Sequence, residues 1–139
     1  MSITMTTKER EQFLAEVHVG VVSIARKDKG PLTVPIWYDY APGGDVWMIT
    51  GKTSIKGKLI SKRNRISLCV QSETAPYKYV SIEGPIKTRA VGEGDLLHMA
   101  IRYLGEKQGK AYAEGSAGED SFVVSITPAS WLTVDYSKL

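Results

Sequence analysis

Short apolar runs separated by turn residues restrict the fold of this chain more than any other feature of its sequence. The runs are rich in β-branched and aromatic residues, and Gly and Pro punctuate the segments between most of them. The first three runs precede any long helical pattern, which favours hairpin-linked strands over a parallel α/β sheet. We predict strands over residues 19–25, 32–40, 46–50, 66–71, 77–91, 122–126 and 131–136.

Two of these predicted strands have features that can be placed more exactly. Residues 66–71 alternate cleanly, so Cys69 is predicted on the face opposite Leu68 and Val70. Within 77–91, Gly84 and Pro85 mark a bend or bulge, because proline cannot donate to a strand ladder. The pattern as a whole predicts an antiparallel barrel of about six or seven strands with helices on its rim.

Helical patterns occur in three segments. Thr6 and Glu9 have the spacing of a capping box. Ile55 and Leu59 lie one helical turn apart and are predicted to share an inner face. The polar stretch 106–120 is predicted to be a helical turn followed by a loop. The three predicted helices cover residues 7–16, 54–62 and 95–105.

The length of 139 residues predicts one domain, residues 1–139, and the 42% hydrophobic content is sufficient for one core. The single cysteine excludes an internal disulfide and a paired-cysteine metal site. No signal-like segment or membrane-length apolar run is visible in the sequence. We therefore expect a soluble, cytoplasmic protein with no membrane partner.

Hydroxyl and ammonium groups gather where the third strand leads into the second helix. Backbone N–H groups at such a junction lack intrahelical partners and attract anions. The sequence has no acidic residue between Asp45 and Glu73, so we expect nothing nearby to neutralise this positive charge. This predicts a site for a phosphate or similar anion, and the alternative is a solvated, lysine-rich helix face. The side chains concerned are Thr50, Lys52, Thr53, Ser54, Lys56 and Lys58.

Acid–base and metal-binding machinery is sparse. His18 and His98 have no partners at metal-ligand spacing, and Cys69 has no base nearby in sequence. Nucleophile-elbow, Walker and dinucleotide-binding signatures are absent, and a net charge of +3 is too small for a dedicated nucleic-acid binder. A protein of this kind leaves the reaction to a cofactor.

Aromatic residues could wall a flat ring, and the alternative is that most lie in the core or in a dimer contact. They are Trp37, Tyr38, Tyr40, Trp47, Tyr77, Tyr79, Trp131 and Tyr136.

Several segments, in their order and spacing, resemble the pyridoxamine 5′-phosphate oxidase-like split-barrel flavoproteins. The segments are Val34–Tyr38, Thr50, Ser54–Leu59, Tyr79–Gly84 and Arg102–Gly105. The resemblance runs from about residue 8 to Tyr136. Within that group the chain is most similar to the flavin/deazaflavin oxidoreductases of the B group, which use coenzyme F420.

This resemblance implies a mainly β fold: a six-stranded antiparallel split β-barrel that forms a homodimer, with cofactors in grooves between the subunits. Thr50 and Lys56 match the phosphate-binding motif of the family, and the backbone of residues 35–37 matches the segment that faces the cofactor ring. Residues near Trp131 are expected to reach the cofactor of the other subunit. The cofactor-binding residues implied are Pro35, Ile36, Trp37, Thr50, Lys52, Ser54, Lys56 and Lys58.

The function implied is that of an oxidoreductase using coenzyme F420 to transfer a hydride to a small conjugated organic acceptor. The unbroken basic run from Lys52 to Arg65 suits the long anionic tail of coenzyme F420. The alternatives are an FMN-dependent oxidoreductase on the same fold and a non-catalytic flavin- or deazaflavin-binding protein. The acceptor pocket is expected between the loops Ser72–Pro76 and Glu106–Glu119, with no metal and no nucleic acid involved.

Overall fold

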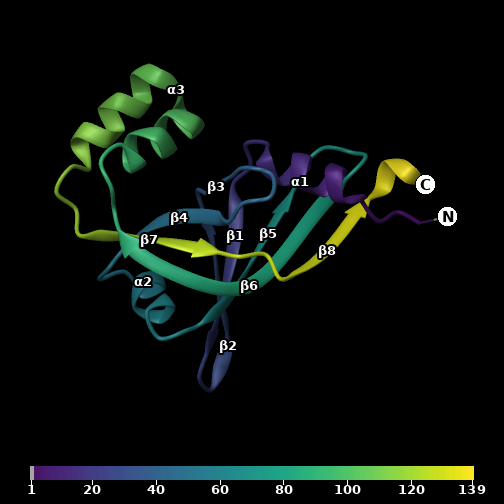
Figure 1. Ribbon diagram of the computed structural model, residues 1–139, viewed down its shortest axis with the longest axis horizontal. Helices are drawn as coiled ribbons and strands as arrows, with labels where there is room; N and C mark the ends of the chain where they lie inside the picture. The colour runs from purple at the N-terminus through teal and green to yellow at the C-terminus, as the bar shows by residue number, and fades with distance from the viewer. Residues whose placement is uncertain (1) are drawn as a thin grey trace.

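The computed structural model describes residues 2–139 and confirms a mainly β, antiparallel architecture (Figure 1). Its hydrogen-bonded strands follow the order β2-β1-β5-β6-β7-β4-β3, and β8 pairs with β6 outside that path. The strands are β1 (Gly20–Arg26), β2 (Lys29–Ile36), β3 (Asp39–Tyr40), β4 (Val46–Gly51), β5 (Arg65–Gln71), β6 (Lys78–Ala90), β7 (Ser121–Ile126) and β8 (Ser130–Asp135). The helices are α1 (Thr7–Ala15), α2 (Ile55–Ile60), α3 (Asp95–Gly115) and the short 3₁₀ helix η1 (Tyr136–Lys138).

Strand β6 joins the two parts of the sheet, an arrangement compatible with a split barrel. Its first half lies between β5 and β8, and its second half pairs with β7 from Ile86 to Ala90. The change of partner occurs at Gly84 and Pro85, where the sequence predicts a bend. The segment that connects β7 to β8 crosses here, and the Ala129 N–H donates to the Glu83 carbonyl at 2.8 Å.

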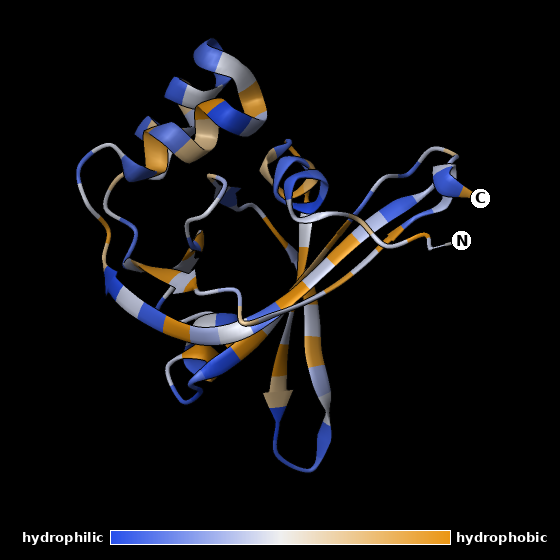
Figure 2. Cartoon of the chain, turned by 45° about the vertical axis from the view of Figure 1, so that its right-hand side comes forward, coloured by the Kyte–Doolittle hydropathy of each residue, from blue (hydrophilic) through white to orange (hydrophobic). Residues whose placement is uncertain are grey.

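Hydrophobic and hydrophilic residues alternate along these strands (Figure 2), and the buried apolar side chains form one core. On β5, Leu68 and Val70 are buried while Cys69 is half-buried, as the alternation predicts. Burial raises the pKa of the Cys69 thiol, which suits a packing residue rather than a nucleophile. None of the helices within residues 2–139 is long and apolar enough to cross a bilayer.

Helix α1 begins with the predicted capping box. The Thr6 hydroxyl accepts from the Glu9 N–H at 3.2 Å, and the Glu9 carboxylate accepts from the Thr6 N–H at 2.7 Å. The predicted inner face of α2 is wrong for Ile55, which is 70% exposed, and right for Leu59, which packs against the core beside the fully buried Ile60. Gly57 packs against Gly51 at the end of β4, so this side of α2 faces the sheet. Ile55 lies two residues earlier, a rotation of roughly 200° about the helix axis, and its side chain therefore points to the opposite side.

Helix α3 extends further than the sequence predicts. Its first half ends at Gly105, whose φ of 83° and ψ of 173° are not helical, so the predicted boundary is confirmed. The polar stretch that follows is a second helical half reaching Gly115 rather than a turn and a loop. Figure 1 shows the two halves lying against one another, away from the sheet.

Gly84 should be intolerant of any side chain. A Cβ there would lie 1.9 Å from the Thr127 carbonyl oxygen, so we expect Gly84→Ala to lower the free energy of unfolding by about 3 kcal/mol. Gly30→Ala is the matched control, because no atom lies within 4 Å of its Cβ position. Urea unfolding measures both changes, and equal midpoints for the two variants would contradict this account of the crossing.

Candidate functional site

One pocket of about 320 Å³ has a polar end and an apolar end. The polar end lies at the junction of β4 and α2, and the apolar end lies beneath α3. At the polar end the lining residues are Thr50, Gly51, Ser54 and Lys56. At the apolar end they include Trp37, Leu96, Met99 and Tyr112. We call this cavity the main pocket.

Close backbone packing shapes the polar end. A Cβ on Gly57 would lie 2.0 Å from the Gly51 carbonyl oxygen, so only glycine lets α2 sit this close to the end of β4. The Ser54 hydroxyl caps α2, donating to the Gly51 carbonyl at 2.8 Å and accepting from the Gly57 N–H at 3.0 Å. The Thr50 hydroxyl lies 3.4 Å from that of Ser54. These contacts fix the hydroxyl groups beside Lys56.

The lysines of this junction differ in their partners. Lys56 is half-buried, lines the main pocket and forms no ion pair within the part of the chain that the structure describes. Lys52 lies 3.2 Å from the carboxylate of Asp120. The expectation that nothing nearby neutralises this charge is therefore wrong, since the fold brings Glu119 to the main pocket and Asp120 to Lys52. Both acids come from the segment before β7, far along the chain.

Of the remaining residues expected to bind the cofactor, Trp37 lines the main pocket, whereas Pro35, Ile36, Lys52 and Lys58 do not. Ile36 is 7% exposed and packs in the core, so only its backbone could meet a ligand. Pro35 lines a separate hollow with His18 and Cys69. Lys58 is exposed on α2 and does not line the main pocket. Trp37 is the member of the 35–37 segment whose side chain reaches it.

Three aromatic rings meet at the apolar end. The ring centroid of Trp37 lies 4.9 Å from that of Tyr103, and the two planes are 5° apart. The centroid of Tyr112 lies 5.3 Å from that of Trp37, with the planes tilted by 50°. Both distances fall in the range of favourable aromatic pairs. The main pocket therefore ends in a wall suited to a flat, apolar ring.

The sequence pattern does not single out Tyr103 or Tyr112 as an aromatic residue that could wall a flat ring. Among the aromatic residues that it does single out, only Trp37 lines the main pocket, whereas Tyr38 and Tyr40 are buried in the core. The signal for Tyr112 was its position as the one aromatic residue of a polar stretch. Periodicity could not show that this stretch folds back over the pocket.

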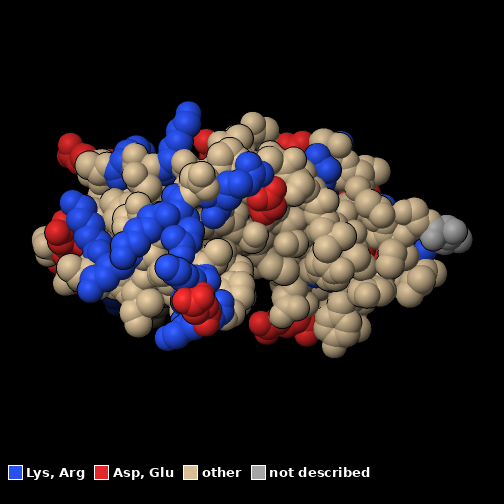
Figure 3. All heavy atoms as spheres, turned by 90° about the horizontal axis from the view of Figure 1, so that it is seen from below, with Lys and Arg blue, Asp and Glu red and all other residues tan. Residues whose placement is uncertain are grey.

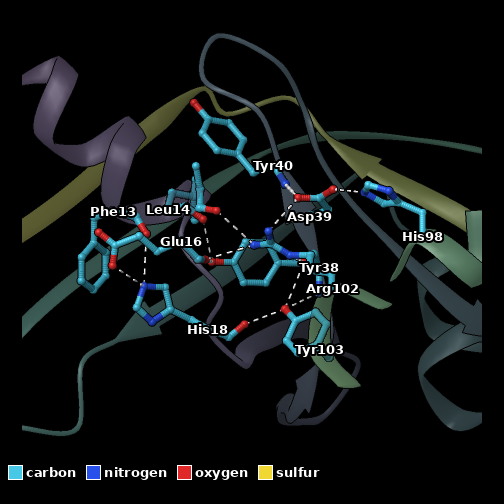
Figure 4. A network of polar contacts seen from close by, with 11 residues as sticks. Phe13, Leu14, Glu16, His18, Tyr38, Asp39, Tyr40, His98, Arg102 and Tyr103 are labelled. Carbon is cyan, nitrogen blue, oxygen red and sulfur yellow. Dashed lines mark hydrogen bonds and ion pairs between the residues drawn. The ribbon is translucent and has the colours of Figure 1, made fainter. Parts of the chain in front are cut away.

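A network of polar contacts joins α3 to the end of α1 (Figure 4). The guanidinium of Arg102 donates to the carbonyls of Ala15 at 3.2 Å and Glu16 at 3.0 Å, and it lies 3.1 Å from the Asp39 carboxylate. The Tyr38 hydroxyl donates to the Leu14 carbonyl at 2.7 Å. These carbonyls are the ones that the end of a helix leaves unpaired.

Tyr103 completes the network. Its hydroxyl oxygen lies 2.6 Å from the His18 carbonyl and 2.9 Å from the Tyr38 carbonyl, and it accepts from the Tyr38 N–H at 3.0 Å. Burial raises the pKa of both Tyr38 and Tyr103, which keeps the hydroxyl groups protonated and able to donate. His98 adds an exposed contact, its Nε2 lying 2.6 Å from the Asp39 carboxylate. We call these contacts the α3 anchor.

Removing one hydroxyl should weaken the α3 anchor measurably. Tyr103→Phe leaves the Tyr38 N–H and the His18 carbonyl without this partner, and we expect a loss of about 1 to 3 kcal/mol in the free energy of unfolding. Tyr77→Phe is the matched control, because Tyr77 is 53% exposed. Denaturant unfolding compares the two, and a loss no larger than that of the control would argue against an anchoring role.

The chain matches the model of a known protein family. The family model described as pyridoxamine 5′-phosphate oxidase matches residues 6–135. No match is found among curated protein sequences.

Solved structures share the fold. A conserved hypothetical protein from Mycobacterium tuberculosis is 21% identical, with a TM-score of 0.77, and the match covers 98% of this chain and 88% of that one. An F420 reductase is 17% identical, with a TM-score of 0.70 and coverage of 88% and 94%. A FAD-binding protein from Mesorhizobium loti is 17% identical, with a TM-score of 0.65 and coverage of 94% and 93%.

Proposed function

The chain belongs to the pyridoxamine 5′-phosphate oxidase family, and on that premise we propose that it is an oxidoreductase using coenzyme F420. Its substrate is a small conjugated organic acceptor. The observation that carries the proposal is the main pocket itself. It has hydroxyls and the Lys56 ammonium group, which forms no ion pair among residues 2–139, at one end and aromatic rings at the other. A cofactor with a flat redox ring and an anionic tail has the same two-ended chemistry.

The donor set of the main pocket fits such a cofactor. Lys56 and Thr50 would donate to a phosphate oxygen, while the Ser54 hydroxyl, which already donates to the Gly51 carbonyl, lies beside them and shapes the site. Trp37 would stack against the ring and exclude water from it. When bound and reduced, a deazaflavin supplies a hydride to an acceptor on its open face. The role of the protein is to orient the two molecules and shield them.

The surface charge favours coenzyme F420 over FMN. A second hollow, of about 600 Å³, is lined by Lys52, Arg63 and Arg89 among others. Lys52 pairs with Asp120 and Arg89 with Asp95, whereas Arg63 has no ion pair among residues 2–139. Figure 3 shows Lys and Arg side chains gathered on the end of the molecule that carries α2. FMN ends in one phosphate, whereas coenzyme F420 continues into a phosphodiester and a glutamate tail that would need such a surface. FMN on the same fold is the alternative, and the similar folds of an F420 reductase and a FAD-binding protein support either group of cofactors.

A second copy of the chain is the expected protein partner. Val17, Val19 and Val21 are 55%, 54% and 38% exposed, and they lie together on the approach to β1 and on its outer face. An apolar surface of this kind is typical of an interface. We propose a homodimer with the cofactor groove between subunits, and light scattering on the purified protein tests the subunit number.

Lys56 and Lys58 provide a matched pair for testing the cofactor site. Both are lysines of α2, but only Lys56 lines the main pocket. We expect Lys56→Ala to weaken binding of coenzyme F420 about 10- to 100-fold, the loss of one charged hydrogen-bonding group. Lys58→Ala should change the dissociation constant much less. Separate calorimetric titrations with coenzyme F420 and FMN measure both variants and identify the cofactor.

The outcomes of these titrations separate the alternatives. Equal affinities for Lys56→Ala and the wild type would remove the site assignment. Tighter binding of FMN than of coenzyme F420 would favour the flavin alternative. Tight binding without turnover across a panel of quinones and enones would identify a non-catalytic carrier.

A further inference from the structure

Tyr112 lines the apolar end of the main pocket from the distal half of α3. It lies on the distal half of α3, on the far side of Gly105, and remains 44% exposed. Its ring nevertheless meets that of Trp37 at a centroid distance of 5.3 Å. Because Tyr112 is both exposed and in contact with Trp37, it forms the boundary between the apolar end of the main pocket and solvent.

The position of Tyr112 is set by two glycines that act in different ways. Gly105 has a φ of 83°, in the left-handed region, and so turns the chain back after the first half of α3. Gly109 then presses the distal half against the first half. A Cβ on Gly109 would lie 2.7 Å from the Ile101 nitrogen and 2.8 Å from its Cα, and backbone atoms cannot move aside as a side chain can.

The first half of α3 is in turn held by the α3 anchor through Arg102 and Tyr103. The ring of Tyr103 also stacks on Trp37. A continuous set of contacts therefore runs from the end of α1, through both halves of α3, to the Tyr112 ring. Because these contacts hold the Tyr112 ring in place, the ring forms a fixed edge of the main pocket rather than a mobile one.

We infer that Tyr112 is the specificity-determining residue for the acceptor and limits the size of the flat conjugated molecule that fits at the apolar end of the main pocket. Gly109 is its positioning residue. The inference rests on the proposed function, since it concerns the molecule that lies beside the cofactor ring. In the reaction a quinone takes up the hydride and one proton from solvent to become the hydroquinone, while the reduced cofactor is oxidised.

Binding without turnover tests the inference directly. The protein is loaded with oxidised coenzyme F420, which holds no hydride to transfer, and titrated by calorimetry with 1,4-naphthoquinone and with 9,10-anthraquinone-2-sulfonate. We expect Tyr112→Ala to weaken naphthoquinone binding about 3- to 10-fold, the effect of one aromatic contact. The larger quinone should lose less, because the truncated side chain opens space. The ratio of the two dissociation constants should therefore shift about 3-fold or more.

Three further variants distinguish an effect of the Tyr112 ring on acceptor choice from a general disruption of α3. Tyr112→Phe keeps the ring and should keep the wild-type ratio. Gly109→Ala should shift the ratio in the same direction as Tyr112→Ala, although Gly109 does not line the main pocket. Lys110→Ala is the control on the same half of α3, because Lys110 is exposed and pairs only with Glu106, at 3.0 Å, within residues 2–139.

An unchanged ratio in both Tyr112→Ala and Gly109→Ala, with wild-type affinity for the cofactor, would overturn the inference and leave the proposed function intact. Failure of the wild-type protein to bind either cofactor would overturn the proposed function, and this inference with it. Steady-state kcat/KM ratios for the same quinones provide a second readout with the reduced cofactor.

Discussion

The unpaired carbonyls at the end of α1 are the constraint on which the pocket depends. A helix leaves its last carbonyls without intrahelical donors, and α1 has no basic residue in its last turn to supply them. Side chains from two distant segments meet this need: Tyr38 donates to Leu14, and Arg102 donates to Ala15 and Glu16. Satisfying these carbonyls therefore also fastens α3 to the body of the protein. Since α3 supplies the outer wall of the main pocket, the cap of one helix determines where the site is enclosed.

Three glycines allow segments of the backbone to approach one another closely at other points of the molecule. Gly57 brings α2 against the end of β4 and so sets the hydroxyls beside Lys56. Gly84 lets the β7–β8 connection cross β6, and Gly109 brings the distal half of α3 against the first. Close backbone contact of this kind leaves little freedom to the side chains around it, which is how a small domain can hold a preformed site.

The acidic neighbours of the basic stretch after β4 differ between the sequence and the folded chain. Along the chain, the basic stretch after β4 has no acidic neighbour, yet Asp120 lies 3.2 Å from Lys52 in space. The pairing leaves Lys56 as the lysine that faces the main pocket without an ion pair among the described residues. Lys56 is therefore the lysine that lines the main pocket, and Glu119 lines the same pocket, whereas Lys52 lies outside its lining.

The sequence by itself determined most of the strands and the residues at the polar end of the main pocket, although the predicted strand 32–40 is divided into β2 and β3. Strand periodicity, the Thr6–Glu9 capping box and the bend at Gly84 all depend on residues close together in the chain, and the structure confirms each of them. Thr50, Ser54 and Lys56 lie within one short segment, so their common lining of the main pocket follows from local geometry. The tertiary structure alone decided the apolar end, because Trp37, Tyr103 and Tyr112 come from segments that meet only when α3 folds back. It also decided that Ile60 rather than Ile55 faces the core, since the contact between Gly57 and Gly51 sets the rotation of α2. Contacts between distant segments carry no periodic signal in the sequence, and for that reason only the folded chain reveals them.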